Sequence, residues 1–588
     1  MSEILQRSTW LLAAGLLGFA GALRAQNAVP PPARELRGSW IATVRNINWP
    51  SEPGLPVAKQ KEQLLTLIDS AAKLRLNALI FQVRPAGDAM YASTIEPWSP
   101  FLTGEMGKSP GWDPLEFAVN EAHKRGMELH AWFNPYRALA GEKHAPSADH
   151  IRRKHPEWTM KYNIDWWMDP GVPEVRQQAI AVMLDVTRRY DVDGIHIDDY
   201  FYPYPIMGPD KKKVEFPDSD TYARYKAAGG PLELTAWRRQ NVDQTVQAIY
   251  EGIKGIKRHV KFGISPFGLW RPNHPEGTGG GLDPYEDLGA DSKKWLQSGW
   301  VDYFTPQLYW TIDRPKLGFI TYYDWWLEQN TQGRHIWPGM NTSNIGTDRV
   351  AGEILRQVSV LRERGLKMTP GHFHWNFGAL HKNTGKIASY TMERAYTTHA
   401  IPPSSPWLSQ VALPAPLVGK TQPEGKLHVE WKHADERWMS HTRWWVLQAQ
   451  IGGRWVTWKS FFKDQRSAEW PAGATAVAIR PCGPAWEAGE AGIGLFGQAK
   501  HVVASARLAH GLFLMKRGAY YNALQEFEAA IRLDPQFAAA HFARAIVLLS
   551  VGAVDRGIQD LDRVIALNPK FAWAYAQRGR ALFAKGER

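Results

Sequence analysis

Two adjacent carboxylates, Asp198 and Asp199, follow a short apolar segment that is typical of a buried strand. Val192, Ile195 and Ile197 give the segment its β-branched character. Because an ionised carboxylate is costly to bury without a partner, the strand is expected to end where the acids begin. Acids at the carboxyl end of a parallel strand, followed by an aromatic loop, predict acid–base chemistry with rings that face a sugar. The alternative interpretation is a helix cap or a loop salt bridge.

The elements that position these acids are expected to alternate between strand and helix. The predicted strands are Gly38–Val44, Ala78–Val83, Glu128–Phe133, Gly194–Asp198, Phe262–Pro266, Val301–Leu308, Ile336–Met340 and Gly371–Trp375. The predicted amphipathic helices include Lys59–Arg75, Leu115–Arg125, Glu174–Tyr190, Leu234–Lys257 and Val350–Arg364. This alternation predicts an α/β fold, a (β/α)8 TIM barrel over residues 35–400, with long insertions after its second, third and fourth strands.

Composition sets broad limits on the function. The chain has 588 residues, so several domains are expected, and its 44% apolar and 22% charged content fits a globular protein. The 28 tryptophans favour carbohydrate binding, although large cores also use tryptophan. A net charge of +12 comes without a nucleic-acid-binding motif, so no nucleic acid partner is expected. Cys482 is the only cysteine, which excludes an internal disulfide.

The first 25 residues resemble a signal peptide. An apolar run from Trp10 to Leu23 follows Arg7, and Ala20-Gly21-Ala22 provides a cleavage site of the A-x-A type. The run is too short to span a bilayer comfortably, so we expect no transmembrane span after signal removal. The segment predicts a periplasmic or secreted protein, and an uncleaved anchor is the alternative.

The residues after the barrel predict two further domains. A linker rich in Pro and Ser is expected over 401–424, and alternating short strands over 425–498 predict a small β-sandwich of fibronectin type III character. Leu533-Asp534-Pro535 recurs 34 residues later as Leu567-Asn568-Pro569, each between amphipathic helices. That period predicts a tetratricopeptide array over 501–588, which is expected to bind a protein partner.

Six segments of the barrel resemble glycosyl hydrolase-like family 10, a bacterial TIM-barrel family of the DUF187 type. They are RGSWIATVRNINWP (37–50), FQVRPAGDAMYASTIEPWSPFLTG (81–104), ELHAWFNPYR (128–137), DGIHIDDYFYP (193–203), FGISPFGLWRP (262–272) and VDYFTPQLYW (301–310). The resemblance implies an exported hydrolase of O-glycosyl bonds that acts on polysaccharide or on the glycan of peptidoglycan.

Most glycosidases need two carboxyl groups that flank the scissile bond. We predict Asp198 first, then Asp199, as a catalytic group. Because neighbouring side chains on a strand point to opposite faces, the two are not expected to form the pair by themselves unless the strand has already turned. Asp88 is the leading candidate for the second carboxyl group, ahead of Glu96 and Glu105. Two other acids, Asp169 and Asp113, are better explained as loop and helix-cap residues.

Polar and aromatic residues near the expected strand ends are candidates for positioning a substrate. They are Gln82, Arg84, Asn134, Tyr136, His196, Tyr200, Trp270, Gln307, Tyr309, Trp310, Asn341 and Trp375. Each of them alone is equally explained as a structural hydrogen-bonding or core residue.

A metal site is a weaker hypothesis. His372 and His374 share one face of the eighth predicted strand, and with His196 and Asp198 they would supply ligands for a divalent ion. The order of these ligands is unlike that of metal hydrolases, so no metal and no cofactor is expected.

The sequence therefore predicts an exported glycoside hydrolase that cleaves a glycan chain of peptidoglycan type or another cell-surface polysaccharide. The alternatives are a glycan-binding barrel or scaffold without catalysis, and a metal-dependent deacetylase on a TIM barrel.

Overall fold

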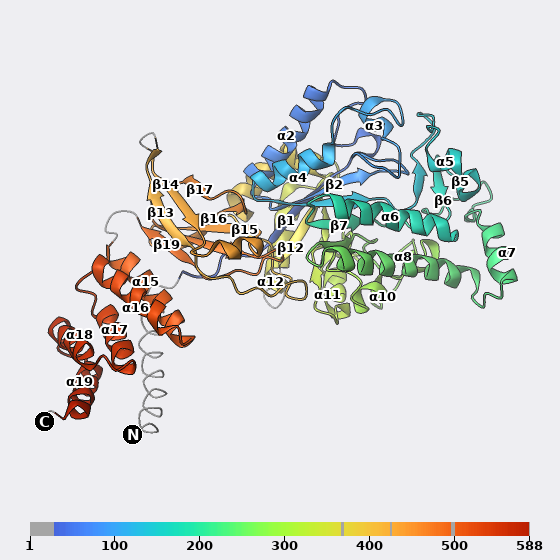
Figure 1. The fold of residues 1–588 in the computed structure, drawn as a ribbon. Helices are drawn as coiled ribbons and strands as arrows, with labels where there is room; N and C mark the ends of the chain where they lie inside the picture. Colours follow the sequence, from blue (N-terminus) through green and yellow to red (C-terminus); the bar gives the residue numbers. More distant parts are fainter. Residues whose placement is uncertain (1–28, 366–369, 424–425, 496–499, 587–588) are drawn as a thin grey trace.

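The computed structural model describes residues 29–365, 370–423, 426–495 and 500–586. A mixed α/β region comes first, followed by a β-rich region and a C-terminal array of helices (Figure 1). The predicted signal peptide at 1–25 lies outside the described residues. Within them, no helix is long and apolar enough to cross a membrane.

A parallel sheet forms the centre of the α/β region. Its strands are β1 (Leu36–Ile41), β2 (Ala78–Arg84), β3 (Glu128–Phe133), β7 (Gly194–Ile197), β8 (Lys261–Ile264), β9 (Tyr303–Phe304), β10 (His335–Ile336), β11 (Gly339–Asn341) and β12 (Gly371–Trp375). Their order in the sheet is β10-β9-β8-β7-β3-β2-β1-β12-β11. The first and last strands of this order, β10 and β11, are successive pieces of one segment. The sheet therefore curves round on itself, as in a TIM-barrel-like fold.

Helices cover the outside of this sheet (Figure 1). The longer ones are α2 (Val57–Lys73), α4 (Pro114–Lys124), α6 (Pro173–Arg189), α8 (Leu234–Ile256), α11 (Phe319–Gln329) and α12 (Ala351–Arg364). The shorter ones are α3 (Pro100–Thr103), α5 (Ile151–Lys154), α7 (Ser219–Ala227), α9 (Pro284–Asp287), α10 (Ser292–Gln297), α13 (Phe377–His381) and α14 (Ile387–Tyr390). The insertion after β3 adds an antiparallel sheet of β4 (Arg137–Leu139), β5 (Thr159–Tyr162) and β6 (Asp165–Met168), which the sequence did not predict.

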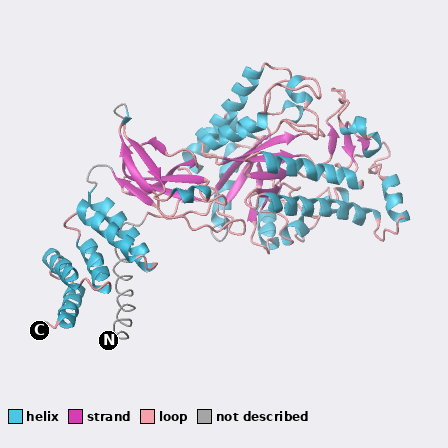
Figure 2. Cartoon of the chain, viewed as in Figure 1, coloured by secondary structure: helices cyan, strands magenta, loops and turns pink. Residues whose placement is uncertain are grey.

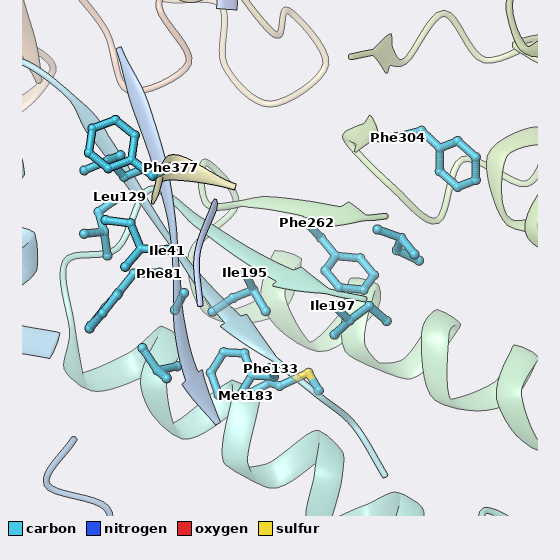
Figure 3. Close-up of a cluster of buried hydrophobic side chains, with 14 of the residues drawn as sticks. Ile41, Phe81, Leu129, Phe133, Met183, Ile195, Ile197, Phe262, Phe304 and Phe377 are labelled. Atoms are coloured by element: carbon cyan, nitrogen blue, oxygen red, sulfur yellow. The ribbon is translucent and has the colours of Figure 1, made fainter. Parts of the chain in front are cut away.

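Side chains alternate between two hydrophobic layers along the strands. Ile195 and Ile197 of β7 belong to the layer between sheet and helices, which Figure 3 shows together with Met183 of α6. The inner layer includes Trp40 and Tyr303. The inner layer is crowded: a Cβ on Gly263 would lie 1.9 Å from the Tyr303 ring, so only glycine fits there.

Seven strands form two antiparallel sheets after the barrel (Figure 2). They are β13 (Leu417–Thr421), β14 (His428–Lys432), β15 (Trp444–Ile451), β16 (Arg454–Phe462), β17 (Ser467–Glu469), β18 (Ala474–Cys482) and β19 (Gly492–Leu495). One sheet has the order β13-β14-β17 and the other β16-β15-β18-β19, and residues of both share one core. β13 lies inside the predicted linker, so strand structure begins before residue 425. The fibronectin type III assignment stays a prediction.

The C-terminal array contains five helices within the described residues 500–586. They are α15 (Lys500–Lys516), α16 (Tyr520–Leu533), α17 (Ala538–Ser550), α18 (Val554–Leu567) and α19 (Ala572–Lys585). Apolar residues of successive helices pack together in two clusters, as expected of a helical repeat.

A buried ion pair joins the β-rich region to the barrel. Arg443 donates from Nη2 to Oδ1 of Asp193 at 2.7 Å and from Nη1 to Asp191 at 2.9 Å. The other oxygen of Asp193 lies 2.9 Å from both His123 Nε2 and the Leu129 amide. Arginine, histidine and amide partners together hold the pKa of Asp193 well below its usual range.

We expect Arg443→Met to lower the free energy of unfolding by about 3 kcal/mol, because it leaves the Asp193 carboxylate buried without its cation. Urea unfolding followed by tryptophan fluorescence measures the effect. Arg466→Met is the matched control, since Arg466 forms an exposed pair with Glu436 that contributes about 0.5 kcal/mol. Equal losses in the two variants would contradict the role of the buried pair.

Candidate active site

The two adjacent acids lie where β7 ends. β7 stops at Ile197, and the alternation of its side chains places His196 in the inner layer. Asp198 continues that inward side and Asp199 begins the following loop. Both side chains are buried, with 4% of each residue exposed.

Asp198 is held by residues of the neighbouring strand β3 and by its own loop. Trp132 Nε1 donates to Asp198 Oδ2 at 2.9 Å, Asn134 Nδ2 lies 3.3 Å from the same oxygen, and the Tyr200 amide donates to Oδ1 at 3.3 Å. Burial, and then the charge of Asp199, raise the pKa of Asp198 to about 7. The carboxyl group is therefore able to hold a proton near neutral pH.

Asp199 has partners on the opposite side. The Tyr204 hydroxyl donates to Asp199 Oδ2, and Gln307 hydrogen-bonds to the same carboxyl group. Burial raises the pKa of Asp199 above its ordinary value, although hydrogen bonds from Tyr204 and Gln307 oppose the rise. The charge of Asp199 acts in turn on the hydroxyl of Tyr309 and raises its pKa. The two side chains thus point in different directions: Asp198 toward β3, and Asp199 toward the loop after β9.

Half-buried aromatic rings surround the acids. Trp375 at the end of β12 packs against Trp132 with ring centroids 5.9 Å apart and stacks on Tyr309 at 6.5 Å. Tyr200 and Tyr204 pack at 5.4 Å on the other side. Aromatic rings therefore lie on both sides of the two acids.

His196 and Gln307 connect this region to the barrel interior. His196 Nδ1 lies 3.0 Å from the Tyr303 hydroxyl and Nε2 lies 3.0 Å from Ser265 Oγ. Gln307 Nε2 donates to the Ser265 carbonyl at 3.0 Å. Burial keeps the pKa of His196 well below its ordinary value, so this ring is neutral.

The described partners of Asp88 belong to its own insertion, so its role as the second carboxyl group stays a prediction. Asp88 is 1% exposed, and its hydrogen bonds come from Ser99 and from the Ala86 amide at 3.2 Å. Burial raises its pKa to about 7. Glu96, in the same insertion, forms a buried ion pair with Arg84, and Glu105 is exposed.

Several predicted substrate-positioning residues have internal partners. Gln82 Oε1 accepts from the amides of Thr43 and Val44 at 2.9 and 2.8 Å. Arg84 donates to the Asn134 carbonyl at 2.6 Å, and Tyr136 donates to Thr245 Oγ1 at 2.8 Å. Gln82 and Arg84 thus bind backbone groups and Tyr136 binds another side chain, whereas the side chain of Asn134 reaches Asp198.

Of the remaining predicted residues, Trp270 and Trp310 lie in loops and Asn341 ends β11. Trp270 donates to Asp291 Oδ1 at 3.0 Å and stacks on Trp325. Trp310 packs on Phe267 at 6.1 Å, and the Asn341 side chain accepts from Ser343 Oγ at 2.7 Å. They stay predicted sugar contacts.

Two acids have the structural roles expected of them. Asp113 caps α4 by accepting from the Leu115 and Glu116 amides. Asp169 accepts from the Gly171 amide at 2.7 Å and from Thr221 Oγ1 at 2.5 Å.

The structure separates the histidines that a metal site would need. His372 and His374 both contact the Tyr396 hydroxyl. Phe373, between them on β12, belongs to the inner layer, so the two histidines point outward, away from His196. Within the described residues, no group of three or more His, Cys, Asp and Glu side chains is placed to hold a metal ion.

Two residues near the acids, Tyr204 and Arg137, were not predicted from the sequence as site residues. Tyr204 belongs to the aromatic loop that follows the acids, and that loop was the available signal. Arg137 stands in the segment NPYR after β3, where nothing in the local pattern predicts which side chain it meets.

Comparison with known families gives two matches. The family model described as "Glycosyl hydrolase-like 10" matches residues 35–352. A TPR repeat model matches residues 511–552.

Curated relatives carry hydrolase names. The chain is 40% identical to "Glycosyl hydrolase YngK" of Bacillus subtilis (strain 168), over 66% of this chain and 77% of that protein. It is 35% identical to "Glycosyl hydrolase DigH" of Escherichia coli (strain K12), over 51% of this chain and 72% of that protein.

Solved structures are more distant. The glycoside hydrolase domain of PgaB (BpsB) from Bordetella bronchiseptica is 13% identical with a TM-score of 0.39, over 61% of this chain and 98% of that one. A structural similarity at this level does not assign a role to any residue of the site.

We expect Asp198→Asn to stabilise the protein at pH 8. The folded pKa of Asp198, about 7, lies above the unfolded value of about 3.9. The folded state therefore loses stability as the pH rises between these values, by on the order of 2–4 kcal/mol. Asparagine avoids this loss and keeps an oxygen that accepts from Trp132.

Denaturant titrations at pH 8 and pH 4 measure the effect, and the gain should shrink toward zero at pH 4. Asp185→Asn, in a surface pair with Arg189 on α6, is the control and should bring no gain. An Asp198→Asn protein that is less stable than the parent at pH 8 would contradict a buried, proton-holding carboxyl group.

Proposed function

We propose that this chain, which belongs to the glycosyl hydrolase-like 10 family, hydrolyses O-glycosidic bonds of a glycan chain with Asp198 and Asp199. The observation that carries the proposal is the pair of buried acids at the end of β7, one of which has a pKa of about 7. An acid that retains its proton near neutral pH is what protonation of a leaving glycosidic oxygen needs.

The two acids differ in a way that suggests separate roles. Asp198 is the general acid in this proposal, because burial and the neighbouring charge keep it protonated. Asp199 is the base or nucleophile in this proposal, because hydrogen bonds from Tyr204 and Gln307 oppose the rise that burial causes in its pKa. Since the charge of Asp199 raises the pKa of Asp198, joint ionisation of the two acids is opposed.

The aromatic rings supply the binding surface in this proposal. Trp375 and Tyr309, stacked 6.5 Å apart beside the acids, present apolar faces to a sugar ring, and Asn134 and Gln307 offer polar groups. The substrate we propose is a peptidoglycan-type glycan or another cell-surface polysaccharide, with no cofactor.

The other regions of the chain complete the proposal. We propose that the chain is exported to the periplasm or the medium, on the basis of the apolar segment within residues 1–25. The tetratricopeptide region, matched at 511–552, is proposed to bind a protein partner, since stacked helix pairs present extended surfaces for that purpose.

A glycan-binding barrel without catalysis is the second candidate. The observation that favours it is the limited exposure of both acids, 4% each, with hydrogen bonds already made to each of them. The deacetylase alternative has less support, because His372 and His374 point away from His196 and Asp198.

We expect Asp198→Asn and Asp199→Asn each to lower kcat by about 10²–10⁴-fold, because each removes a proton-transfer group. Mass spectrometry of products from a panel of wall glycans and polysaccharides measures the loss. Polysaccharide pull-down should persist in both variants, since the aromatic surface is unchanged.

Asp88→Asn is the matched comparison, because it changes an equally buried acid outside the pair. It should retain activity within a few fold, with folding checked by circular dichroism. A loss in Asp88→Asn alone would move the second carboxyl role to that residue. A wild-type protein that binds these glycans and cleaves none of them would favour the binding barrel.

A further inference from the structure

Arg137 is a buried cation beside the acid pair. It is 6% exposed and begins β4, directly after the loop that carries Asn134. Its guanidinium lies 4.6 Å from the centre of the Tyr200 ring and 5.5 Å from that of Trp167. Nη1 donates to the Pro85 carbonyl at 3.2 Å. The two aromatic faces and this carbonyl fix the charge in one place.

The charged groups around Arg137 leave a surplus of positive charge. Asp165 Oδ2 lies 3.3 Å from Arg137 Nε, while Asp165 Oδ1 accepts from Arg45 at 2.5 Å. One carboxylate is thus shared by two arginines. The remaining titratable groups that face this cation are Tyr200, Asp198 and Asp199. Burial raises the pKa of all three, and the charge of Arg137 opposes that rise.

Arg137 acts on the two acids through space, since no hydrogen bond joins its guanidinium to either of them. Charges separated by protein interior interact far more strongly than charges in water. Because a guanidinium stays protonated across the whole physiological range, its charge is constant while the acids titrate. It therefore stabilises the ionised member of the pair at every working pH.

The backbone of Arg137 performs a separate task. Its amide donates to Asn134 Oδ1 at 2.8 Å, and Asn134 in turn directs its Nδ2 toward Asp198. Substitution of the side chain leaves this amide in place. The geometry of Asp198 and the charge acting on it are thus separable by mutation.

We propose that Arg137, held against the rings of Tyr200 and Trp167 next to the Asp198–Asp199 pair, is a positioning residue that stabilises the ionised form of the pair. The proposal rests on the proposed function for its kinetic consequence, but the charge state itself is a property of the folded protein. It also assigns Tyr200 a role, as the aromatic face that holds the guanidinium against the acids.

The test compares Arg137→Gln with Arg137→Lys on the purified full-length protein. With the cation removed, both limbs of the pH profile of kcat/KM should move up by about one pH unit. Activity one unit below the wild-type optimum then falls about tenfold, while activity above the optimum is retained. Lysine restores the charge without the planar stacking group, so Arg137→Lys should return both limbs close to their wild-type positions.

Arg45→Gln is the matched control. It removes the same charge from the same Asp165, but at a side chain that is 47% exposed and lies over neither Tyr200 nor Trp167. Its pH profile should match wild type. An equal displacement in Arg45→Gln and Arg137→Gln would reduce the effect to general surface charge and overturn the proposal.

A second readout does not depend on hydrolysis. Infrared difference spectra follow the protonated carboxyl band of the pair with pH, and Asp198→Asn and Asp199→Asn assign it. The midpoint should rise by about one unit in Arg137→Gln and return in Arg137→Lys. A moved midpoint without any glycan cleavage would refute the proposed function alone. Cleavage with unmoved midpoints would refute the role of Arg137 alone.

Discussion

The alternation of side chains along β3 is the constraint on which both ends of the barrel depend. Residues two apart on a strand face the same side, so Glu128, His130 and Trp132 share the inward face. Glu128 contacts Lys261 and accepts from Trp486 of the β-rich region at 2.6 Å. At the other end of the same face, Trp132 donates to Asp198 at 2.9 Å.

One strand therefore links a fully paired carboxylate to an acid with a raised pKa. Burial acts on both carboxyl groups, yet the Lys261 ammonium group next to Glu128 lowers the pKa of that acid. Asp198 has only neutral donors in contact, and burial prevails over them. The difference in partners, and not a difference in depth, explains why the pKa of Glu128 is lowered while that of Asp198 is raised.

The sequence predicted the barrel well where periodicity determines structure. β3 and β12 have the predicted bounds, because their side chains are buried on both faces. The predictions were too long at Phe262–Pro266 and Val301–Leu308, and the predicted strand Ile336–Met340 is divided into β10 and β11. Each of these segments contains a proline, which has no N–H to donate to the ladder. The carbonyls of Pro266, Pro306 and Pro338 still accept from the next strand, so the chain continues in place while regular pairing stops.

The candidate site was harder to predict, because its roles depend on partners distant in sequence. Gln82 and Asn134 both lie near strand ends. The side chain of Gln82 accepts hydrogen bonds from the amides of Thr43 and Val44, whereas the side chain of Asn134 contacts Asp198. Likewise the raised pKa of Asp88 arises inside its own insertion. The types and spacing of residues in the sequence indicate which side chains are capable of chemistry, whereas only the fold determines which of them lie close together.

The position of the β-rich region follows from the same physical argument. Its Arg443 pairs with Asp193, which precedes β7, and its Trp486 reaches Glu128 at the start of β3. Both contacts lie at the amino ends of the strands, opposite to Asp198 and Asp199. Burying charge at that end is favourable because the ions are paired there. At the carboxyl end the same burial leaves Asp198 without a contacting cation, and Arg137 acts on it only from a distance. The buried acids at the amino end of the barrel are therefore paired with cations. At the carboxyl end, burial without a contacting cation raises the pKa of Asp198, and the proposed chemistry depends on that raised pKa.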